Sequence, residues 1–337
     1  MNDLMLVTGA TGHVGNTLVR ELVAQKKQVR AFVLPGEDTT ALKDLPVEIV
    51  AGDVLDPASL RAAFSGVDVV FHLAGIISIM PGPDEVMRKV NVTGTKNVLW
   101  AAKEAGVRRL VYTSSIHALQ RPPFGVMIDE SLPFDPTNPA GEYDRTKAEA
   151  TLAVLEAAHA GLDAIIVCPT GIIGPHDYRR SETGLLIVAW MREKLSLLVD
   201  GIFDFVDVRD IARGHILACE KGKSGETYIL GGERVSLARL WVLVREAAGI
   251  YSQTVIIPFR LAAFAAEGAA LWYRLTRTRG RFTPYSLETV NSNSDICIAK
   301  ARRELGYAPR PISETIHDTV QWWREFGFRK SSGTSQP

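Results

Sequence analysis

Two residues with the spacing for proton transfer stand in the segment EYDRTK. Tyr143 and Lys147 lie four residues apart, which is about one helical turn, so the two side chains share one helix face. A phenol with an unperturbed pKa of about 10 is a poor base at neutral pH. A nearby ammonium favours the phenolate, so we expect Lys147 to lower the pKa of Tyr143. Ser115, at the end of VYTSS, offers a hydroxyl to the same substrate oxygen. The three residues predict proton exchange with a carbonyl/alcohol pair.

A glycine-rich turn, LVTGATGHVG, opens the chain directly behind an apolar run. Gly9, Gly12 and Gly15 recur every three residues at the junction between a predicted strand and a predicted helix. A bare backbone at a helix N-terminus can hold a diphosphate, although an ordinary tight turn would give the same pattern. Asp53 and the pair Ala74–Gly75 follow later strands, where a carboxylate can accept from an adenine amino group and small residues leave room for a cofactor.

The elements that position these residues alternate between strand and helix. Apolar runs at residues 3–9, 28–34, 46–53, 67–75, 108–115 and 162–175 predict strands, and helical patterns lie between them. The alternation indicates an α/β fold with a doubly wound parallel sheet and a smaller, interleaved C-terminal lobe. We expect a dinucleotide-binding domain at 1–174 to which 203–231 return, a mainly substrate-binding lobe at 175–330, and a disordered tail at 331–337. Two apolar helices are predicted at Leu237–Ala248 and Phe259–Leu275.

Composition excludes several classes of protein. Lys+Arg and Asp+Glu both number 38, so nothing in the balance of charge asks for nucleic acid or an acidic membrane surface. The three cysteines have neither disulfide nor metal spacing, which favours a reduced cytoplasmic compartment. We expect no metal, no signal peptide and no membrane span. An interfacial helix at Phe259–Leu275, followed by arginines, is the weaker alternative to a lid or a dimer contact.

In this order, the motifs TGATGHVG, GDVLD, HLAG, NVTGTKNVL, YTSS, Tyr143-x-x-x-Lys147 and PTGIIGP resemble the extended short-chain dehydrogenase/reductase family. The similarity spans nearly the whole chain and is strongest to the dihydroflavonol-reductase-like and 3β-hydroxysteroid-dehydrogenase-like branch, among NAD-dependent epimerase/dehydratase proteins. It implies that Tyr143 is the acid/base, that Lys147 binds the nicotinamide ribose and tunes the tyrosine, and that Ser115 binds the substrate oxygen. Asn91 matches a helix asparagine whose role is structural or water-binding rather than directly catalytic.

The resemblance also implies a set of cofactor contacts. These are Gly9, Thr11, Gly12, His13, Val14, Val33, Leu34, Asp53, Val54, Leu73, Ala74, Gly75, Tyr143, Lys147, Pro169, Gly171 and Ile172.

The departures from the family bear on the substrate. Where sugar-nucleotide enzymes carry an arginine to clamp a second diphosphate, this chain has Cys168, and no arginine precedes Phe205. Arg179 and Arg180 are possible substitutes, or part of a solvated loop. We therefore expect an NAD(P)-dependent oxidoreductase acting on a small hydrophobic carbonyl or secondary alcohol, with His117 as a candidate substrate contact. A sugar-nucleotide epimerase/dehydratase is the alternative, and a non-catalytic dinucleotide sensor a third.

Cofactor choice depends on the end of the second strand, VRAFVLPGED. The position of the ribose carboxylate falls on Val33, and that of the neighbouring arginine falls on Leu34. The missing carboxylate, His13 and Lys43 favour NADP, whereas Glu37 and Asp38 oppose it. We expect NADP to be slightly favoured over NAD, with modest discrimination. Family members commonly pair two helices into a dimer interface, and the helices at 91–106 and 142–161 look apolar on more than one face, so we also expect a homodimer.

Overall fold

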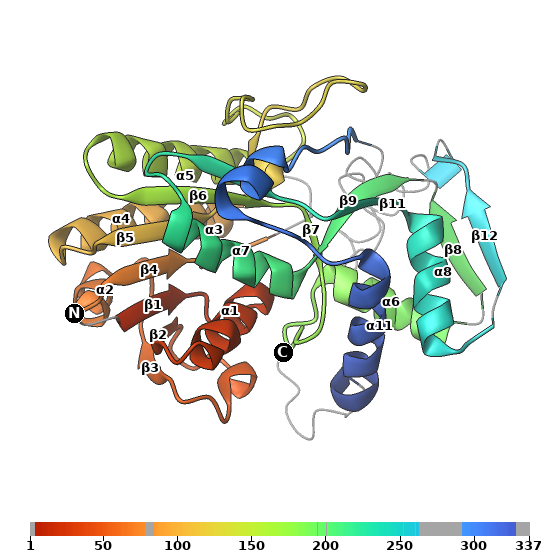
Figure 1. The fold of residues 1–337 in the computed structure, drawn as a ribbon, viewed down its shortest axis with the longest axis horizontal. Helices are drawn as coiled ribbons and strands as arrows, with labels where there is room; N and C mark the ends of the chain where they lie inside the picture. Colours follow the sequence, from red (N-terminus) through yellow and green to blue (C-terminus); the bar gives the residue numbers. More distant parts are fainter. Residues whose placement is uncertain are drawn as a thin grey trace.

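The computed structural model describes residues 4–77, 84–193, 195–199, 201–251, 253–259, 261–262 and 292–327. Its centre is a seven-stranded parallel sheet in the order β10-β6-β5-β4-β1-β2-β3 (Figure 1). The strands are β1 (Leu4–Thr8), β2 (Gln28–Val33), β3 (Glu48–Ala51), β4 (Val69–His72), β5 (Arg109–Thr113), β6 (Ala164–Pro169) and β10 (Thr227–Leu230). The order reverses at β1, which lies between β2 and β4, and ligand crevices open at such a switch point. The doubly wound fold expected from the sequence is confirmed.

Helices cover both faces of this sheet because each buries one apolar stripe. On one face α1 (His13–Ala24) packs beside α7 (Val208–Lys221), in a core that includes Leu18, Leu22 and Ile216. The other face carries α2 (Pro57–Phe64), α4 (Thr95–Glu104) and α5 (Glu142–His159), whose core includes Phe64, Val98 and Val154. Short segments complete this half: η1 (Thr40–Leu42), α3 (Glu85–Arg88), η2 (Lys89–Gly94) and η3 (Ile116–Ala118).

The second lobe has its own small sheets and core. Strands β7 (Gly171–Ile173), β9 (Ile202–Asp207) and β11 (Glu233–Ser236) form one sheet, and β8 (Leu195–Val199) pairs with β12 (Gln253–Ile257) in another (Figure 1). Helices α6 (Glu182–Arg192), α8 (Leu237–Ala248) and α11 (Ile312–Trp322) pack on them, followed by η5 (Trp323–Gly327). The core here is aromatic, with Trp190, Trp322 and Trp323 buried.

The two halves are interleaved. The chain leaves β9 in the lobe, forms α7 over the large sheet and adds β10 to its edge before returning to β11. Later, η4 (Ala301–Leu305) returns to the large sheet and packs against α7 and β10. The helix predicted at Leu237–Ala248 is confirmed as α8, whereas most of the helix predicted at Phe259–Leu275, and the tail at 331–337, lie outside the described residues.

Two sequence expectations need correction. The strand predicted at 162–175 is two strands, β6 and β7, in different sheets, because Thr170 between them turns away and donates its hydroxyl to Asp204 at 2.6 Å. The helices at 91–106 and 142–161 are not apolar on their outer faces. Among their exposed residues only Trp100 and Leu152 are large and apolar, and the others include Lys96, Lys103, Glu104 and Glu156. No helix within the described ranges is both long and apolar enough to cross a membrane.

Candidate active site

The candidate residues from the sequence gather at one edge of the large sheet. Gly9 follows β1, Leu34 follows β2 and Asp53 follows β3. The Leu73–Gly75 segment follows β4, and Ser115 follows β5. All of these strands are parallel, so their carboxyl ends meet at the same edge and line one crevice.

The glycine turn packs so closely that its backbone has no room for side chains at Gly9 and Gly15. Gly9 has φ 66°, and a Cβ there would lie 2.8 Å from the Ala74 nitrogen. A Cβ on Gly15 would lie 2.0 Å from the Gly9 oxygen, so the first turn of α1 can close on the loop only without one. Helix α1 starts at His13 after Gly12, and no side chain caps its first N–H groups. Free N–H groups at a helix N-terminus fit a diphosphate, so this cradle fits a dinucleotide.

Buried hydrogen bonds fix the ends of β1 and β4 behind this cradle. The Thr8 hydroxyl accepts from the Leu73 and Ala74 N–H groups at 3.2 and 3.1 Å, which leaves its own proton for Nδ1 of His72 at 2.8 Å. The His72 proton therefore sits on Nε2 and is donated to Thr95 at 3.0 Å. Burial lowers the pKa of His72 to about 3, so the ring is neutral and structural.

The side walls of the crevice are fixed by local hydrogen bonds. Asp53 is half-buried and its carboxylate accepts from the Leu55 N–H at 2.9 Å, while Val54 packs against Gly94. Asn91 exchanges two hydrogen bonds with the backbone of Ile76, at 2.8 and 3.0 Å. Asn91 thus orders the loop beyond Gly75 rather than facing a reactive atom.

At the end of β2 the two expected ribose positions differ in exposure. The Val33 side chain is 5% exposed and belongs to the apolar core under α1, whereas Leu34 is 49% exposed. A carboxylate at position 33 would therefore be buried, and Val33 is a poor place for one. The nearest carboxylate is that of Glu37, which accepts from the Leu34 N–H at 3.1 Å.

The structure brings Ser115, Tyr143 and Lys147 together. Ser115 is 6% exposed, and its hydroxyl lies near enough to the phenol of Tyr143 to lower the pKa of that group. It also accepts from the His117 N–H at 3.2 Å, which caps η3 and holds the serine in place. Lys147 is 7% exposed, and its ammonium donates hydrogen bonds to the Tyr112 hydroxyl at 2.9 Å and to the Thr113 carbonyl at 2.5 Å. The contact with Tyr112 could not be predicted from the sequence, since an apolar strand gives no sign of what its tyrosine contacts.

The expected electrostatics of this trio need correction. Burial raises the pKa of Tyr143 to about 12, although the hydrogen bond from Ser115 works in the opposite direction. Burial also lowers the pKa of Lys147 to about 7, because its ammonium has left water for the protein interior. Proximity to Lys147 does not offset burial here, so the phenol is protonated and ready to act as an acid at neutral pH.

His117 lies beside Tyr143. Its ring is edge-on to Tyr143, with centroids 6.5 Å apart, and stacked on Phe203 at 5.9 Å. Nδ1 of His117 lies 3.6 Å from the fully buried carboxylate of Asp144, which also pairs with Arg121 at 3.1 Å. Burial is the largest influence on the ring and lowers the pKa of His117. Phe203 comes from the lobe, so this stack joins the two halves at the site.

The segment after β6 closes the far side of the crevice. Pro169 ends β6, and Ile172 is half-buried against the core. A Cβ on Gly171 would lie 2.9 Å from the Phe205 ring, so a larger residue would push this segment away from the lobe. Cys168 is fully buried beneath it, and burial raises the pKa of its thiol to about 12.

The arginines suggested as clamps for a substrate diphosphate lie elsewhere. Arg179 donates to Thr11 of the glycine turn at 2.9 Å and pairs with Glu37, so it faces the dinucleotide crevice and not the substrate side. Arg180 is exposed, with φ 55°. Nε2 of His13, in the glycine turn, contacts the Pro175 carbonyl at 2.9 Å.

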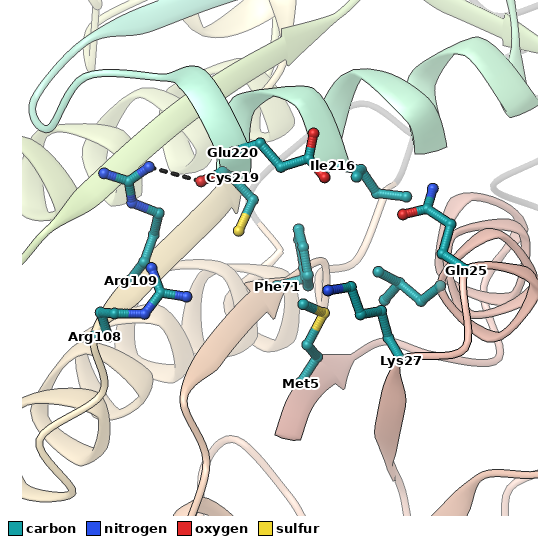
Figure 2. A pocket seen from close by; sticks show the side chains of 10 residues that line it. Met5, Gln25, Lys27, Phe71, Arg108, Arg109, Ile216, Cys219 and Glu220 are labelled. Atoms are coloured by element: carbon teal, nitrogen blue, oxygen red, sulfur yellow. Dashed lines mark hydrogen bonds between the residues drawn. The ribbon is translucent and has the colours of Figure 1, made fainter. Parts of the chain in front are cut away.

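A separate cavity opens at the opposite edge of the sheet. It has a volume of about 240 Å³ and is lined by residues that include Lys27, Arg108, Arg109 and Glu220 (Figure 2). Its arginines already have partners. Arg108 forms a bidentate ion pair with Asp68, and Arg109 donates hydrogen bonds to Asp163 and to the Cys219 carbonyl. The cavity lies at the amino ends of β1 and β5, far along the strands from the glycine turn. No group of three metal-ligating side chains occurs in the part of the chain that the structure describes.

The doubly wound sheet and the glycine cradle together fit an enzyme that binds a dinucleotide. The model of the NAD dependent epimerase/dehydratase family matches residues 5–231. The chain belongs to this family, within the extended short-chain dehydrogenases/reductases, and is a nicotinamide-dependent oxidoreductase, as its sequence resemblance implied.

Relatives cover nearly the whole chain. It is 38% identical over 329 residues to sterol demethylase protein B of Methylococcus capsulatus, covering 96% of this chain and 99% of that protein. It is 34% identical over 327 residues to a 4-hydroxy-2-methyl-3-oxo-4-farnesyl-3,4-dihydroquinoline-1-oxide ketoreductase of Stigmatella aurantiaca, covering 94% and 95% of the two chains. Among solved structures, gox2253 superposes with a TM-score of 0.84 at 36% identity, covering 97% of this chain and 99% of that one.

Proposed function

We propose that this protein transfers hydride between a nicotinamide cofactor and a carbonyl or secondary alcohol on a flat, hydrophobic small molecule. The observation that carries the proposal is the grouping of Ser115, Tyr143 and Lys147, with the last two one helical turn apart on α5, beside the glycine cradle. When bound, the nicotinamide ring supplies or accepts the hydride.

The residues of the chain handle the proton. In the direction of reduction, Tyr143 gives its phenolic proton to the carbonyl oxygen, and the high pKa of the phenol keeps that proton available at neutral pH. The Ser115 hydroxyl orients the phenol and offers a second hydrogen bond to the same oxygen. Lys147, in its charged form, stabilises the phenolate that remains, because opposite charges attract more strongly in a buried site than in water. In the direction of oxidation, the same phenolate takes the proton back.

The substrate class follows from the lobe side of the site. His117 and Phe203 stack as a flat wall beside Tyr143, and Phe205 packs edge-on against Phe203 with centroids 5.6 Å apart. Such a surface suits a ring system better than a charged sugar nucleotide. Two relatives are named for a sterol and for a farnesylated quinoline, which are both large and apolar. A sterol-like or isoprenoid ketone or alcohol is therefore the substrate class that we favour.

The alternative function, that of a sugar-nucleotide epimerase or dehydratase, would need an arginine to bind a second diphosphate. Position 168 is a buried cysteine, and Arg179 is turned to the glycine turn. A bidentate arginine is the usual partner of a second diphosphate, and neither position 168 nor Arg179 supplies one on the substrate side.

Further assignments complete the proposal. The enzyme works in the cytoplasm, which suits its free Cys168, Cys219 and Cys297, and it is a homodimer through α4 and α5. NADP is slightly preferred to NAD. Residues 1–174 and 203–231 bind the dinucleotide, and the remaining lobe holds the substrate.

A panel of steroid, isoprenoid and small aromatic ketones and alcohols, followed at the absorbance of the reduced nicotinamide with both cofactors, tests the function. We expect stoichiometric cofactor turnover with at least one apolar compound, lost in the Tyr143→Phe variant. Conversion of a sugar nucleotide without net cofactor consumption would instead establish the alternative.

A further inference from the structure

An eight-residue loop from the lobe, residues 174–181, crosses over the start of α1. It is tied there by two hydrogen bonds to its backbone: His13 Nε2 contacts the Pro175 carbonyl at 2.9 Å, and Asn16 donates to the His176 carbonyl at 3.1 Å. The loop turns through positive φ at His176 (67°) and Arg180 (55°), which side chains adopt only where the surroundings hold them. These ties carry Arg179 to the glycine turn.

Arg179 bridges the two parts of the crevice that would meet the adenosine half of a dinucleotide. One nitrogen of its guanidinium, Nη2, donates both to the Thr11 hydroxyl at 2.9 Å and to the Glu37 carboxylate. Thr11 belongs to the diphosphate cradle. Glu37 is anchored to the backbone at the end of β2, the usual location of the group that reads the ribose 2′ position. The residue at the end of β2, Val33, is buried, and Leu34 is apolar.

We propose that the two partners of the Arg179–Glu37 ion pair read the ribose 2′ position, one for each cofactor. Arg179 binds the 2′-phosphate of NADP, and Glu37 accepts a hydrogen bond from the 2′-hydroxyl of NAD. This inference rests on the nicotinamide cofactor of the proposed function and deepens it, because the cation and the carboxylate absent from positions 33 and 34 come from residues 179 and 37.

The arrangement explains why neither cofactor should be excluded. A 2′-phosphate gains a charge-assisted bond to Arg179 but must compete with Glu37 for it, and Asp38 adds a second negative charge nearby. Asp38 is itself held by Thr40, through bonds of 2.6 and 2.8 Å from the hydroxyl and the N–H. A 2′-hydroxyl leaves the ion pair intact and uses the free lone pairs of the Glu37 carboxylate. NADP thus gains the contact with Arg179 but not the one with Glu37, and NAD gains the contact with Glu37 but not the one with Arg179.

Dissociation constants measured without substrate test the proposal. NADH and NADPH are titrated into the full chain by calorimetry, and 2′,5′-ADP and 5′-AMP serve as fragments that differ at the 2′ position. Arg179→Ala should weaken NADPH and 2′,5′-ADP by about 10-fold to 100-fold, as expected for one charge-assisted hydrogen bond, and leave NADH within about threefold. Arg179→Lys should recover part of the loss. Arg180→Ala, the exposed neighbour, is the matched control and should change neither constant.

Glu37→Gln should act in the opposite sense, because it removes a repelling charge and weakens an acceptor. We expect NADPH to bind about threefold or more tightly and NADH to bind more weakly. Equal weakening of both cofactors by Arg179→Ala would place Arg179 on the shared diphosphate and overturn the proposal, as would no change in either. An unchanged pair of constants in Glu37→Gln would overturn the role of Glu37. If wild-type protein bound neither dinucleotide, the proposed function would fall first, and that result is distinct from a loss of discrimination.

Discussion

The ammonium of Lys147 lies 2.9 Å from the phenol oxygen of Tyr112, with its nitrogen 4.5 Å from the centre of that ring. Tyr112 sits on β5, directly before the strand end that leads to Ser115, so the strand that presents the serine also holds the lysine. Lys147 is therefore placed by the sheet and not by Tyr143. Tyr112 and Lys147 thus form a buried pair beside the proposed catalytic residues Ser115 and Tyr143.

Tyr112→Phe should move the alkaline limb of the kcat/KM profile to lower pH. The Tyr112 hydroxyl accepts a hydrogen bond from the charged lysine and favours it, so its loss lowers the pKa of Lys147 further below about 7. Activity needs the charged lysine and is lost above that pKa. Tyr228→Phe is the matched control, because Lys300 lies over the Tyr228 ring at 4.9 Å, away from the site. If the alkaline limb of the kcat/KM profile did not move in Tyr112→Phe, Tyr112 would have no role in positioning Lys147.

Tyr143→Phe should preserve the fold and the affinity for the nicotinamide cofactor while removing nearly all turnover. Only the proton-transfer group is lost, and such groups contribute roughly 10²–10⁴-fold. Initial rates, calorimetric cofactor binding and the melting temperature together check this outcome. Turnover near that of wild type would show that another group carries the proton.

Leu34→Arg should shift the ratio of the two cofactor efficiencies towards NADP. Leu34 is 49% exposed beside the anchored Glu37, so an added guanidinium has room and meets the 2′ position. We expect the wild-type preference to be about 10-fold at most, which is about 1.4 kcal/mol. The ratio of kcat/KM values for the two cofactors measures the shift. An unchanged ratio would mean that the adenosine ribose does not lie beside this loop.

The protein should be a dimer at micromolar concentration in light scattering. The surface that we assign to the contact is small in apolar content, with Trp100 and Leu152 each 40% exposed among charged residues. Leu152→Glu should therefore favour the monomer, since it places a charge on one of the two large apolar side chains of that surface. A monomeric wild-type protein would contradict the prediction.

Lowering the pH from 7.5 to 5.0 should destabilise the fold partly through His215. Its ring accepts from the Thr113 hydroxyl at 2.7 Å and donates to the Ile211 carbonyl at 2.8 Å, and burial lowers its pKa to about 4. In the unfolded chain this histidine has a pKa of about 6.5. Between about pH 4 and pH 6.5 the unfolded chain therefore binds more protons than the folded protein, so the free energy of unfolding falls as the pH falls. This ring alone accounts for about 2 kcal/mol at pH 5.

Urea denaturation at the two pH values measures the effect. His215→Gln should lose about 2 kcal/mol less than wild type over this interval, and the exposed His159→Gln should behave as wild type does. Equal losses in His215→Gln and wild type would mean that the ring does not remain neutral in the fold.

Much of the fold and the reacting trio could be predicted because their signals are local. The periodicity at Leu237–Ala248 reflects the apolar stripe of one helix, and the glycines at 9, 12 and 15 reflect one turn. Contacts between distant segments carry no such signal. Arg179 reaches Glu37 across 142 positions, and Lys147 reaches Tyr112 across 35. The break at Thr170 was missed for the same reason, since its partner Asp204 comes from a later strand.

The single residue between β6 and β7 has a consequence for how this chain can change. Because the path crosses between the sheets at Thr170, again between β9 and α7, and again after β10, no cut separates the lobe as one continuous piece. A fragment ending at residue 174 would lack the edge strand β10 and the helix α7 that covers one sheet face. Such a fragment would not fold autonomously, so the lobe cannot be exchanged as a cassette.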